Sequence, residues 1–213
     1  MRQQAAGYRH VEELQAEFAA CRAVIRQRLS EFRAVRRSDY FFEMAYCILT
    51  PQSSATRAAA AIDALRALDR WDDHDLLART LARKESYIRF HRTKATHLAE
   101  AHLQFPEIDS RLQDGQDGDE LRSWLVANVR GLGWKEASHF LRNIGHRNLA
   151  ILDRHILRNL QQHGVLSSLP KTMTRKNYLA IEERFALFSE HVGVTLDELD
   201  LLFWSRETGQ VLK

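Results

Sequence analysis

Apolar side chains recur at helical spacing along nearly all of this chain. From residue 11 to about residue 36 they fall on one side of a helix, and polar residues occupy the other side. The apolar positions of this stretch are Val11, Leu14, Phe18, Cys21, Ile25, Leu29 and Phe32. A one-sided stripe at this period predicts an amphipathic helix that packs on a core.

The same spacing predicts further helices. Their expected ranges are 39–49, 54–68, 73–82, 84–103, 119–129, 135–144, 154–163, 175–191 and 196–204. Ser38 is suited to cap the helix that begins at residue 39, and either Ser53 or Ser54 the one after it. Thr195 and Glu198 form a capping box for the last helix. No segment alternates with period two, so we expect an all-α fold.

Composition adds limits rather than a function. With 213 residues, 45% of them hydrophobic, the chain is long enough for one large domain or two small domains that share a cleft. The balance of 31 basic and 28 acidic residues gives a net charge of +3. This mild excess allows nucleic acid as a partner without requiring it.

Cysteine and histidine usage argues against a metal centre. Two cysteines, Cys21 and Cys47, are too few for a four-cysteine iron–sulfur cluster, and they read as free thiols in a reducing compartment. The ten histidines show no close metal-binding spacing. From this usage we expect no metal. The sequence also contains no apolar run of membrane-spanning length and no signal-type segment, so we expect no membrane association and a cytoplasmic location.

The segment 129–135 joins two of the predicted helices through a very short link that contains Gly131 and Gly133. Both glycines tolerate positive φ and close backbone approach, and Leu132 between them would point into the core. Their N–H groups, with those that open the next helix, would face outward unpaired and form a phosphate site backed by the helix dipole. An ordinary tight turn between helices explains the same two glycines.

Two residues near this link carry candidate chemistry. Lys135 opens the helix after the link, and its amine in the neutral form would be a nucleophile beside a bound sugar. Asp153 follows the apolar residues 150–152 and precedes a helix, so it is a candidate N-cap. A fixed, ionised carboxylate would also stabilise positive charge at a sugar carbon. A solvated lysine and a purely structural cap remain the alternatives.

These residues stand in two stretches, Gly-Leu-Gly-Trp-Lys-Glu-Ala-Ser-His-Phe-Leu-Arg-Asn-Ile-Gly at 131–145 and Ala-Ile-Leu-Asp-Arg-His-Ile at 150–156. Both resemble the helix-hairpin-helix DNA glycosylase superfamily, and most of all the short type 2 class of 8-oxoguanine DNA glycosylase/AP lyase. The resemblance implies two helical lobes with a DNA cleft between them. One lobe would span 36–147, and the other would combine 1–35 with 148–213.

The resemblance also implies a mechanism. A damaged base leaves the duplex and enters a pocket, the Lys135 amine attacks C1′ of its sugar, and a Schiff base forms. β-Elimination then nicks the strand, while Asp153 activates the amine and stabilises the positive charge. No cofactor is needed.

Two further segments resemble parts of the same family. The family's tail folds back so that its terminal lysine forms the pocket, which assigns Lys213 to base recognition through its amine and its α-carboxylate. Trp204 would stack on the flipped base or, equally, belong to the core. Pro51 and Gln52 match an early turn that lines the pocket or fills the gap in the DNA, and Ser53 would contact DNA; a polar turn explains Gln52 as well.

A basic segment with aromatic residues suits a DNA face. Its members are Arg83, Lys84, Tyr87, Arg89, Phe90, His91, Arg92 and Lys94. Among them we assign Arg92 and Lys94 to phosphates and Phe90 to the opposite base, and we add Arg130 from the glycine link. A solvated basic helix is the alternative for each basic residue.

Together these features predict a monomeric, bifunctional glycosylase/AP lyase that acts on 8-oxoguanine and abasic sites in double-stranded DNA. One alternative is a glycosylase of the same fold for another damaged base. A second is a helix-hairpin-helix module that binds DNA without catalysis.

Overall fold

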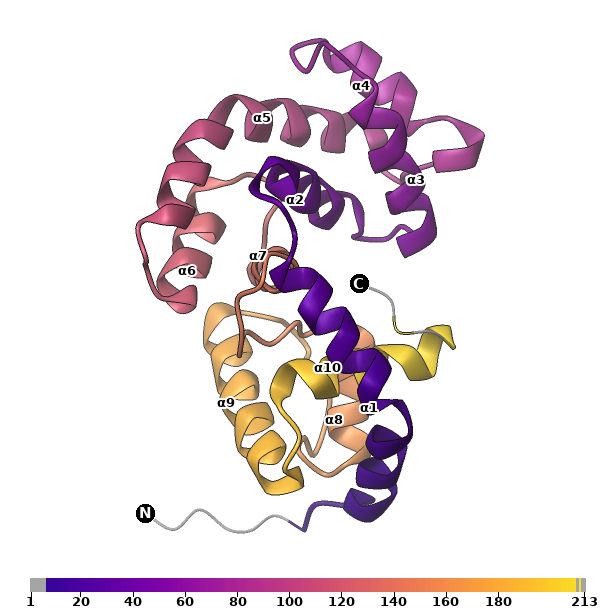
Figure 1. Cartoon of the computed structure of the whole chain (residues 1–213), viewed down its shortest axis with the longest axis vertical. Coiled ribbons are helices and arrows are strands. Elements are labelled where there is room, and N and C mark those ends of the chain that lie inside the picture. Colours follow the sequence, from indigo (N-terminus) through magenta and orange to yellow (C-terminus); the bar gives the residue numbers. More distant parts are fainter. Residues whose placement is uncertain (1–6, 210, 212–213) are drawn as a thin grey trace. The chain divides into compact units, whose positions relative to one another are not determined.

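The computed structural model describes residues 7–209 and 211, and helices make up all the regular structure of these residues (Figure 1). In chain order the α-helices are α1 (Val11–Arg33), α2 (Tyr40–Leu49), α3 (Ala55–Arg66), α4 (His74–Leu81), α5 (His91–Gln113), α6 (Gly118–Asn128), α7 (Trp134–Asn143), α8 (Arg154–Gln162), α9 (Arg175–Val192) and α10 (Leu196–Thr208). Two 3₁₀ turns, η1 (Arg37–Asp39) and η2 (Lys84–Ser86), precede α2 and α5. The predicted all-α class is confirmed.

The chain forms two compact units. One contains residues 35–144, and the other combines residues 1–34 with 145–213. None of the described helices is both long and apolar enough to cross a membrane.

In the unit of residues 35–144, α2 is the central helix. It packs against α3, α5 and α7, and its residues are buried from Glu43 to Leu49. The one carboxylate in this run, Glu43, accepts a hydrogen bond from Asn143 Nδ2 at 2.9 Å, which satisfies a charge that would otherwise be costly to bury. An apolar helix buried on most sides therefore provides the platform on which α7 lies.

In the other unit, α1 packs along α10, and α10 also contacts α8 and α9 (Figure 1). The backbone N–H of Arg9 donates to the carbonyl of His163, the residue that follows α8, at 3.0 Å. The Gln15 side chain donates to the carbonyl of Val192 at 2.8 Å. Residues from the two ends of the chain thus share one core.

Three of the predicted helix caps are confirmed. Ser54 accepts from the N–H of Arg57, Asp153 caps α8, and Thr195 forms a reciprocal box with Glu198. The expected role of Ser38 is wrong, because η1 intervenes and α2 begins at Tyr40 with no side-chain cap at Asp39.

The helix predicted at 84–103 is confirmed over residues 91–103, but its predicted start and end are wrong. The backbone turns through η2, and Phe90 then adopts a left-handed conformation at φ 59° before α5 begins at His91. The N–H of Ile88 bonds to the carbonyl of Leu81, which ties this segment to α4 instead of to a local helix. At its other end α5 continues through Pro106 to Gln113, ten residues beyond the predicted end.

Candidate active site

The glycine link between α6 and α7 begins at Val129 and ends at Gly133. Gly131 has φ +93°, and a Cβ there would lie 2.8 Å from His97 Nδ1, so only glycine fits. Leu132 is buried, as predicted, and its N–H donates to the carbonyl of Val129. The link is therefore a tight hairpin fixed by one glycine and one buried leucine.

Gly133 differs from the expectation. Its φ of −87° is accessible to any residue, so it is not needed for a left-handed turn. Its N–H is also not unpaired, because it donates to Glu136 Oε2 at 3.2 Å. A Cβ at this position would meet the same carboxylate oxygen at 2.9 Å. The backbone of the hairpin thus already binds one anionic group, which the chain itself supplies.

Lys135 lies in the first turn of α7, with 24% of its side chain exposed. Its Nζ is 3.6 Å from Glu136 Oε1, so the carboxylate is shared between the amine and the hairpin N–H. The amine is accessible enough for chemistry and near the backbone group that we expect to bind phosphate.

The structure contradicts the predicted role of Lys94 as a phosphate contact. It does not present its charge to solvent on a DNA face: the residue is only 6% exposed, and Nζ donates to the carbonyls of Leu49 and Pro51 at 2.7 Å each. Burial, and then the positive charge of Lys135, lower the pKa of Lys94 to about 8. Its position fits an internal support of the turn after α2, and a phosphate contact would require these two bonds to break.

The turn at 50–54 lies beside this lysine. Pro51 is partly buried, and Gln52 is exposed with a left-handed backbone at φ 57°. Ser53 Oγ accepts from the N–H of Arg89, which joins the turn to the segment before α5. The structure therefore brings the predicted residues Pro51, Gln52 and Ser53 to the segment that holds Phe90.

The remaining basic and aromatic candidates of this unit are exposed. Phe90 is 52% exposed and lies 4.9 Å beneath the guanidinium of Arg89. Arg92 is exposed on the first turn of α5. Arg130, in the hairpin, forms an ion pair with Glu100 at 3.2 Å, so part of its charge is neutralised within the chain.

Asp153 belongs to the other unit, where it caps α8. One carboxylate oxygen, Oδ1, accepts from the N–H groups of His155 and Ile156 at 2.8 and 2.9 Å. The apolar segment before it is fixed by two residues that the sequence analysis missed. Tyr178 donates to the carbonyl of Ala150 at 2.5 Å, and Glu182 accepts from the N–H of the same residue at 2.7 Å. The carboxylate is thus held firmly and remains partly exposed.

Trp204 lies near the same helix. Its ring is partly exposed and tilted against His155, with centroids 5.1 Å apart, and His155 pairs with Glu207. Partial exposure is compatible with both readings of this tryptophan, as a stacking surface and as part of the core. Lys213 lies outside the described residues.

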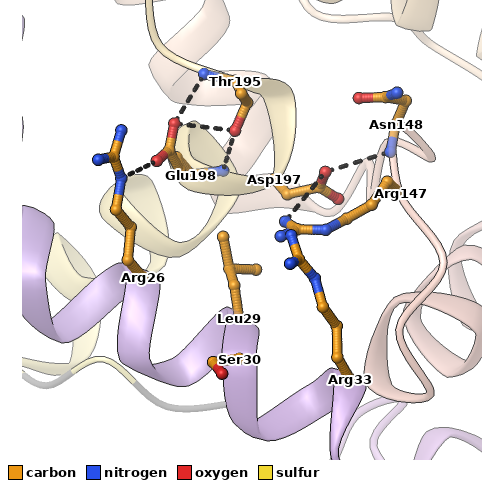
Figure 2. A pocket seen from close by; sticks show the side chains of 9 residues that line it. All are labelled: Arg26, Leu29, Ser30, Arg33, Arg147, Asn148, Thr195, Asp197 and Glu198. Carbon is orange, nitrogen blue, oxygen red and sulfur yellow. Dashed lines mark hydrogen bonds and ion pairs between the residues drawn. The ribbon is translucent and has the colours of Figure 1, made fainter.

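A pocket of about 430 Å³ lies in the same unit and contains none of the predicted site residues (Figure 2). Figure 2 shows two of its arginines paired with carboxylates of α10. Arg26 bonds to Glu198 at 2.8 Å, and Arg147 lies 3.6 Å from Asp197. We interpret this pocket as the ionic junction of α1 with the start of α10. Among the described residues, no three His, Cys, Asp or Glu side chains gather as a metal site.

The family model for 8-oxoguanine DNA glycosylase matches residues 25–194 of the chain. The chain belongs to this family. Curated 8-oxoguanine DNA glycosylase/AP lyases from Korarchaeum cryptofilum and Fusobacterium nucleatum are 40% and 36% identical to it. These matches cover 90% and 96% of the chain, and 91% and 98% of the relatives.

A solved structure of the 8-oxoguanine DNA glycosylase of Methanocaldococcus jannaschii agrees with a TM-score of 0.84. The two chains are 32% identical, and 95% of each is covered. A second structure of the M. jannaschii enzyme, in complex with a 15mer DNA that contains 8-oxoguanine, gives a TM-score of 0.83. The resemblance read from the hairpin motif and the predicted helix-hairpin-helix fold are both confirmed.

Glu136 is a candidate functional residue that was not predicted from the sequence. One feature of the sequence could have indicated it. A glutamate three residues after an N-cap can reach back to the backbone N–H of the cap, and Glu136 stands three residues after Gly133. Nothing in the sequence pattern gives the contact of the same carboxylate with Lys135.

Proposed function

We propose that this chain excises 8-oxoguanine from double-stranded DNA and then cleaves the strand at the abasic site. The observation that carries the proposal is Lys135, a partly exposed amine two residues after Gly133 of the glycine hairpin, in a chain of the 8-oxoguanine DNA glycosylase family. The hairpin N–H groups would bind a backbone phosphate and bring the deoxyribose to the amine.

The chemistry needs only side chains of the protein. The neutral amine of Lys135 forms a bond to C1′ while the bond from C1′ to the base breaks, and the base leaves with the electron pair and takes up a proton. Opening of the sugar gives a protonated Schiff base. Loss of a proton from C2′ then expels the 3′ phosphate, and water releases the lysine from the cleaved strand.

Asp153 would supply the negative charge that this sequence of steps requires. Positive charge develops at C1′ as the base departs, and an ionised carboxylate stabilises it without a metal or cofactor. The cap bonds hold the carboxylate of Asp153 in one orientation, so no reorganisation is needed at the moment of reaction.

Base recognition would involve Lys213, Trp204, Pro51 and Gln52. 8-Oxoguanine differs from guanine by an N–H at N7, and the α-carboxylate of Lys213 is a suitable acceptor for it. Guanine would leave that acceptor unpaired, which provides discrimination. Action on chromosomal DNA implies a cytoplasmic, nucleoid-associated location.

Borohydride trapping on duplexes that carry 8-oxoguanine tests the proposal. The wild-type chain should form a covalent adduct, and Lys135→Gln should form none. Lys171→Gln, which changes an exposed lysine of the other unit, is the matched control and should trap like the wild type.

Three results would overturn parts of the proposal. Equal trapping by Lys135→Gln and the wild type would remove the nucleophile assignment. Faster cleavage of duplexes with thymine glycol or an alkylated purine than of those with 8-oxoguanine would support a different lesion, and DNA binding with no adduct on any substrate would support the non-catalytic module.

A further inference from the structure

The carboxylate of Glu136 lies between the hairpin and the amine of Lys135. Oε2 accepts from the N–H of Gly133 at 3.2 Å, and Oε1 is 3.6 Å from Lys135 Nζ. Only 16% of the Glu136 side chain is exposed. A single carboxylate therefore engages both groups that the proposed function assigns to DNA, the phosphate-binding N–H and the nucleophilic amine.

Lys94 adds a second positive charge to this cluster. Its ammonium is fixed by the carbonyls of Leu49 and Pro51, so it cannot move away from its neighbours without breaking both bonds. The charge of Lys135 lowers the pKa of Lys94, and the charge of Glu136 raises it. Both charges of the Lys135–Glu136 pair therefore act on Lys94, and loss of the Glu136 charge would lower the pKa of Lys94 further.

A DNA phosphate at the hairpin would compete with Glu136. Both groups are anions that accept from the N–H of Gly133, and they repel each other at short range. If phosphate takes the N–H, the carboxylate must withdraw, and Lys135 then loses its counter-ion. The amine has then lost its ion-pair partner at the moment when the sugar arrives, so it can turn towards C1′.

We propose that Glu136 is a positioning residue that occupies the place of a DNA phosphate at Gly133 and holds the amine of Lys135 in an ion pair until the DNA backbone displaces it. The inference rests on the proposed roles of the hairpin and of Lys135. It assigns Glu136 a role before the chemical step and no contact with the reacting atoms.

Other charged groups near the hairpin are accounted for within the unit. His97 of α5 faces Gly131, and burial and the charge of Arg130 lower its pKa. Arg130 pairs with Glu100. From the helices that pack on α7, Glu43 of α2 bonds to Asn143, and Arg122 of α6 bonds to Asp119 and Ser138. The charges that shift the pKa of Lys94 are those of Lys135 and Glu136, and the charge of Lys94 in turn contributes to the lowered pKa of His97.

The central experiment compares Glu136→Gln with the wild type. Glutamine keeps an oxygen that can accept from the N–H of Gly133, so the cap survives while the charge is lost. The control is Glu107→Gln, which removes the same charge from an exposed position of α5. Binding is measured on a duplex with a tetrahydrofuran abasic analogue at low and high salt, and borohydride trapping on a true abasic duplex is measured across pH.

We expect Glu136→Gln to bind the analogue several-fold more tightly at low salt, with the difference shrinking as salt screens it. The pH profile of trapping should differ from that of the wild type, because the carboxylate that pairs with the amine is gone. Glu107→Gln should match the wild type in both. Unchanged binding and an unchanged pH profile in Glu136→Gln overturn the proposal, as does an equal shift in the control.

A measurement on the wild type tests the same idea without a variant. The amide resonance of Gly133 should follow the titration of Glu136 in the free protein and lose that dependence in the complex with the analogue duplex. Persistence of the dependence in the complex contradicts displacement. If the wild type forms no trapped adduct, the proposed function itself has failed; if it traps normally while Gly133 behaves identically in both states, the inference alone has failed.

Discussion

The Nζ atom of Lys94 lies 2.7 Å from the carbonyl oxygen of Pro51, a residue 43 positions earlier in the chain. With its second bond to the carbonyl of Leu49, this ammonium closes the end of α2 and fixes the turn that we assign to the base pocket. A buried lysine used in this way is sensitive both to substitution and to pH.

Lys94→Met should destabilise the protein by about 1–3 kcal/mol near neutral pH, because two carbonyls lose their donor. Urea denaturation measures this difference. Lys84→Met, at an exposed position of η2, is the control and should change stability by no more than about 0.5 kcal/mol. A stability equal to the wild type would show that the two bonds contribute nothing.

The same pair of proteins gives a pH prediction. The pKa of Lys94 is lowered from 10.5 to about 8 in the folded chain, so between these values the folded state has lost a proton that the unfolded state retains. Stability then rises with pH through this window. The advantage of the wild type over Lys94→Met should grow by about 1–2 kcal/mol between neutral and strongly alkaline pH. A difference independent of pH would contradict the burial of a charged amine.

Asp153 allows its structural and chemical roles to be separated. Asp153→Ala removes the cap of α8 and should cost about 1–2 kcal/mol of stability. Asp153→Asn keeps a good cap and should unfold close to the wild type, yet it lacks the charge that stabilises C1′. We expect excision by the asparagine variant to fall at least about 100-fold in single-turnover assays. Wild-type excision rates in this variant would leave Asp153 with a capping role only.

The two hairpin glycines should respond differently to alanine. Gly131→Ala forces a Cβ against His97 at φ +93° and should both destabilise the chain by more than about 1 kcal/mol and weaken DNA binding. Gly133→Ala meets only the movable end of Glu136 from an ordinary backbone conformation, so its effect on stability should be smaller. Thermal unfolding of both variants gives the comparison. A larger loss of stability in Gly133→Ala than in Gly131→Ala would contradict our interpretation that Gly131 is the glycine that the turn requires.

Removal of Lys213 tests the proposed base pocket. The truncated chain should lose excision of 8-oxoguanine more than cleavage at preformed abasic sites, because only the first reaction needs recognition of the base. Single-turnover rates on the two duplexes give the comparison. The substitution Lys213→Ala removes the amine and keeps the residue in place, so it tests the amine separately from the main chain. Equal losses on both substrates would argue against a pocket built from the tail.

Features that depend on neighbours in the sequence were predictable. Asp153 could be read as a cap because a helix follows it directly, and Leu132 as buried because it lies between two glycines in a short link. Features that depend on distant partners were not. The bond from Ile88 to Leu81, which delays α5, and the carbonyls that bury Lys94 are set by tertiary packing. For this reason the sequence predicted Lys94 as an exposed phosphate contact on a DNA face.

The packing of α1 against α10 has a consequence for folding during synthesis on the ribosome. Residues 35–144 form a compact unit from contiguous sequence and can close as soon as they leave the exit tunnel. The first helix emerges earlier but must wait with its apolar stripe uncovered until about 160 further residues have been translated. During this time the apolar face of α1 is exposed to chaperones and to other nascent chains. Slow or faulty folding during synthesis should therefore originate in α1 before any other helix.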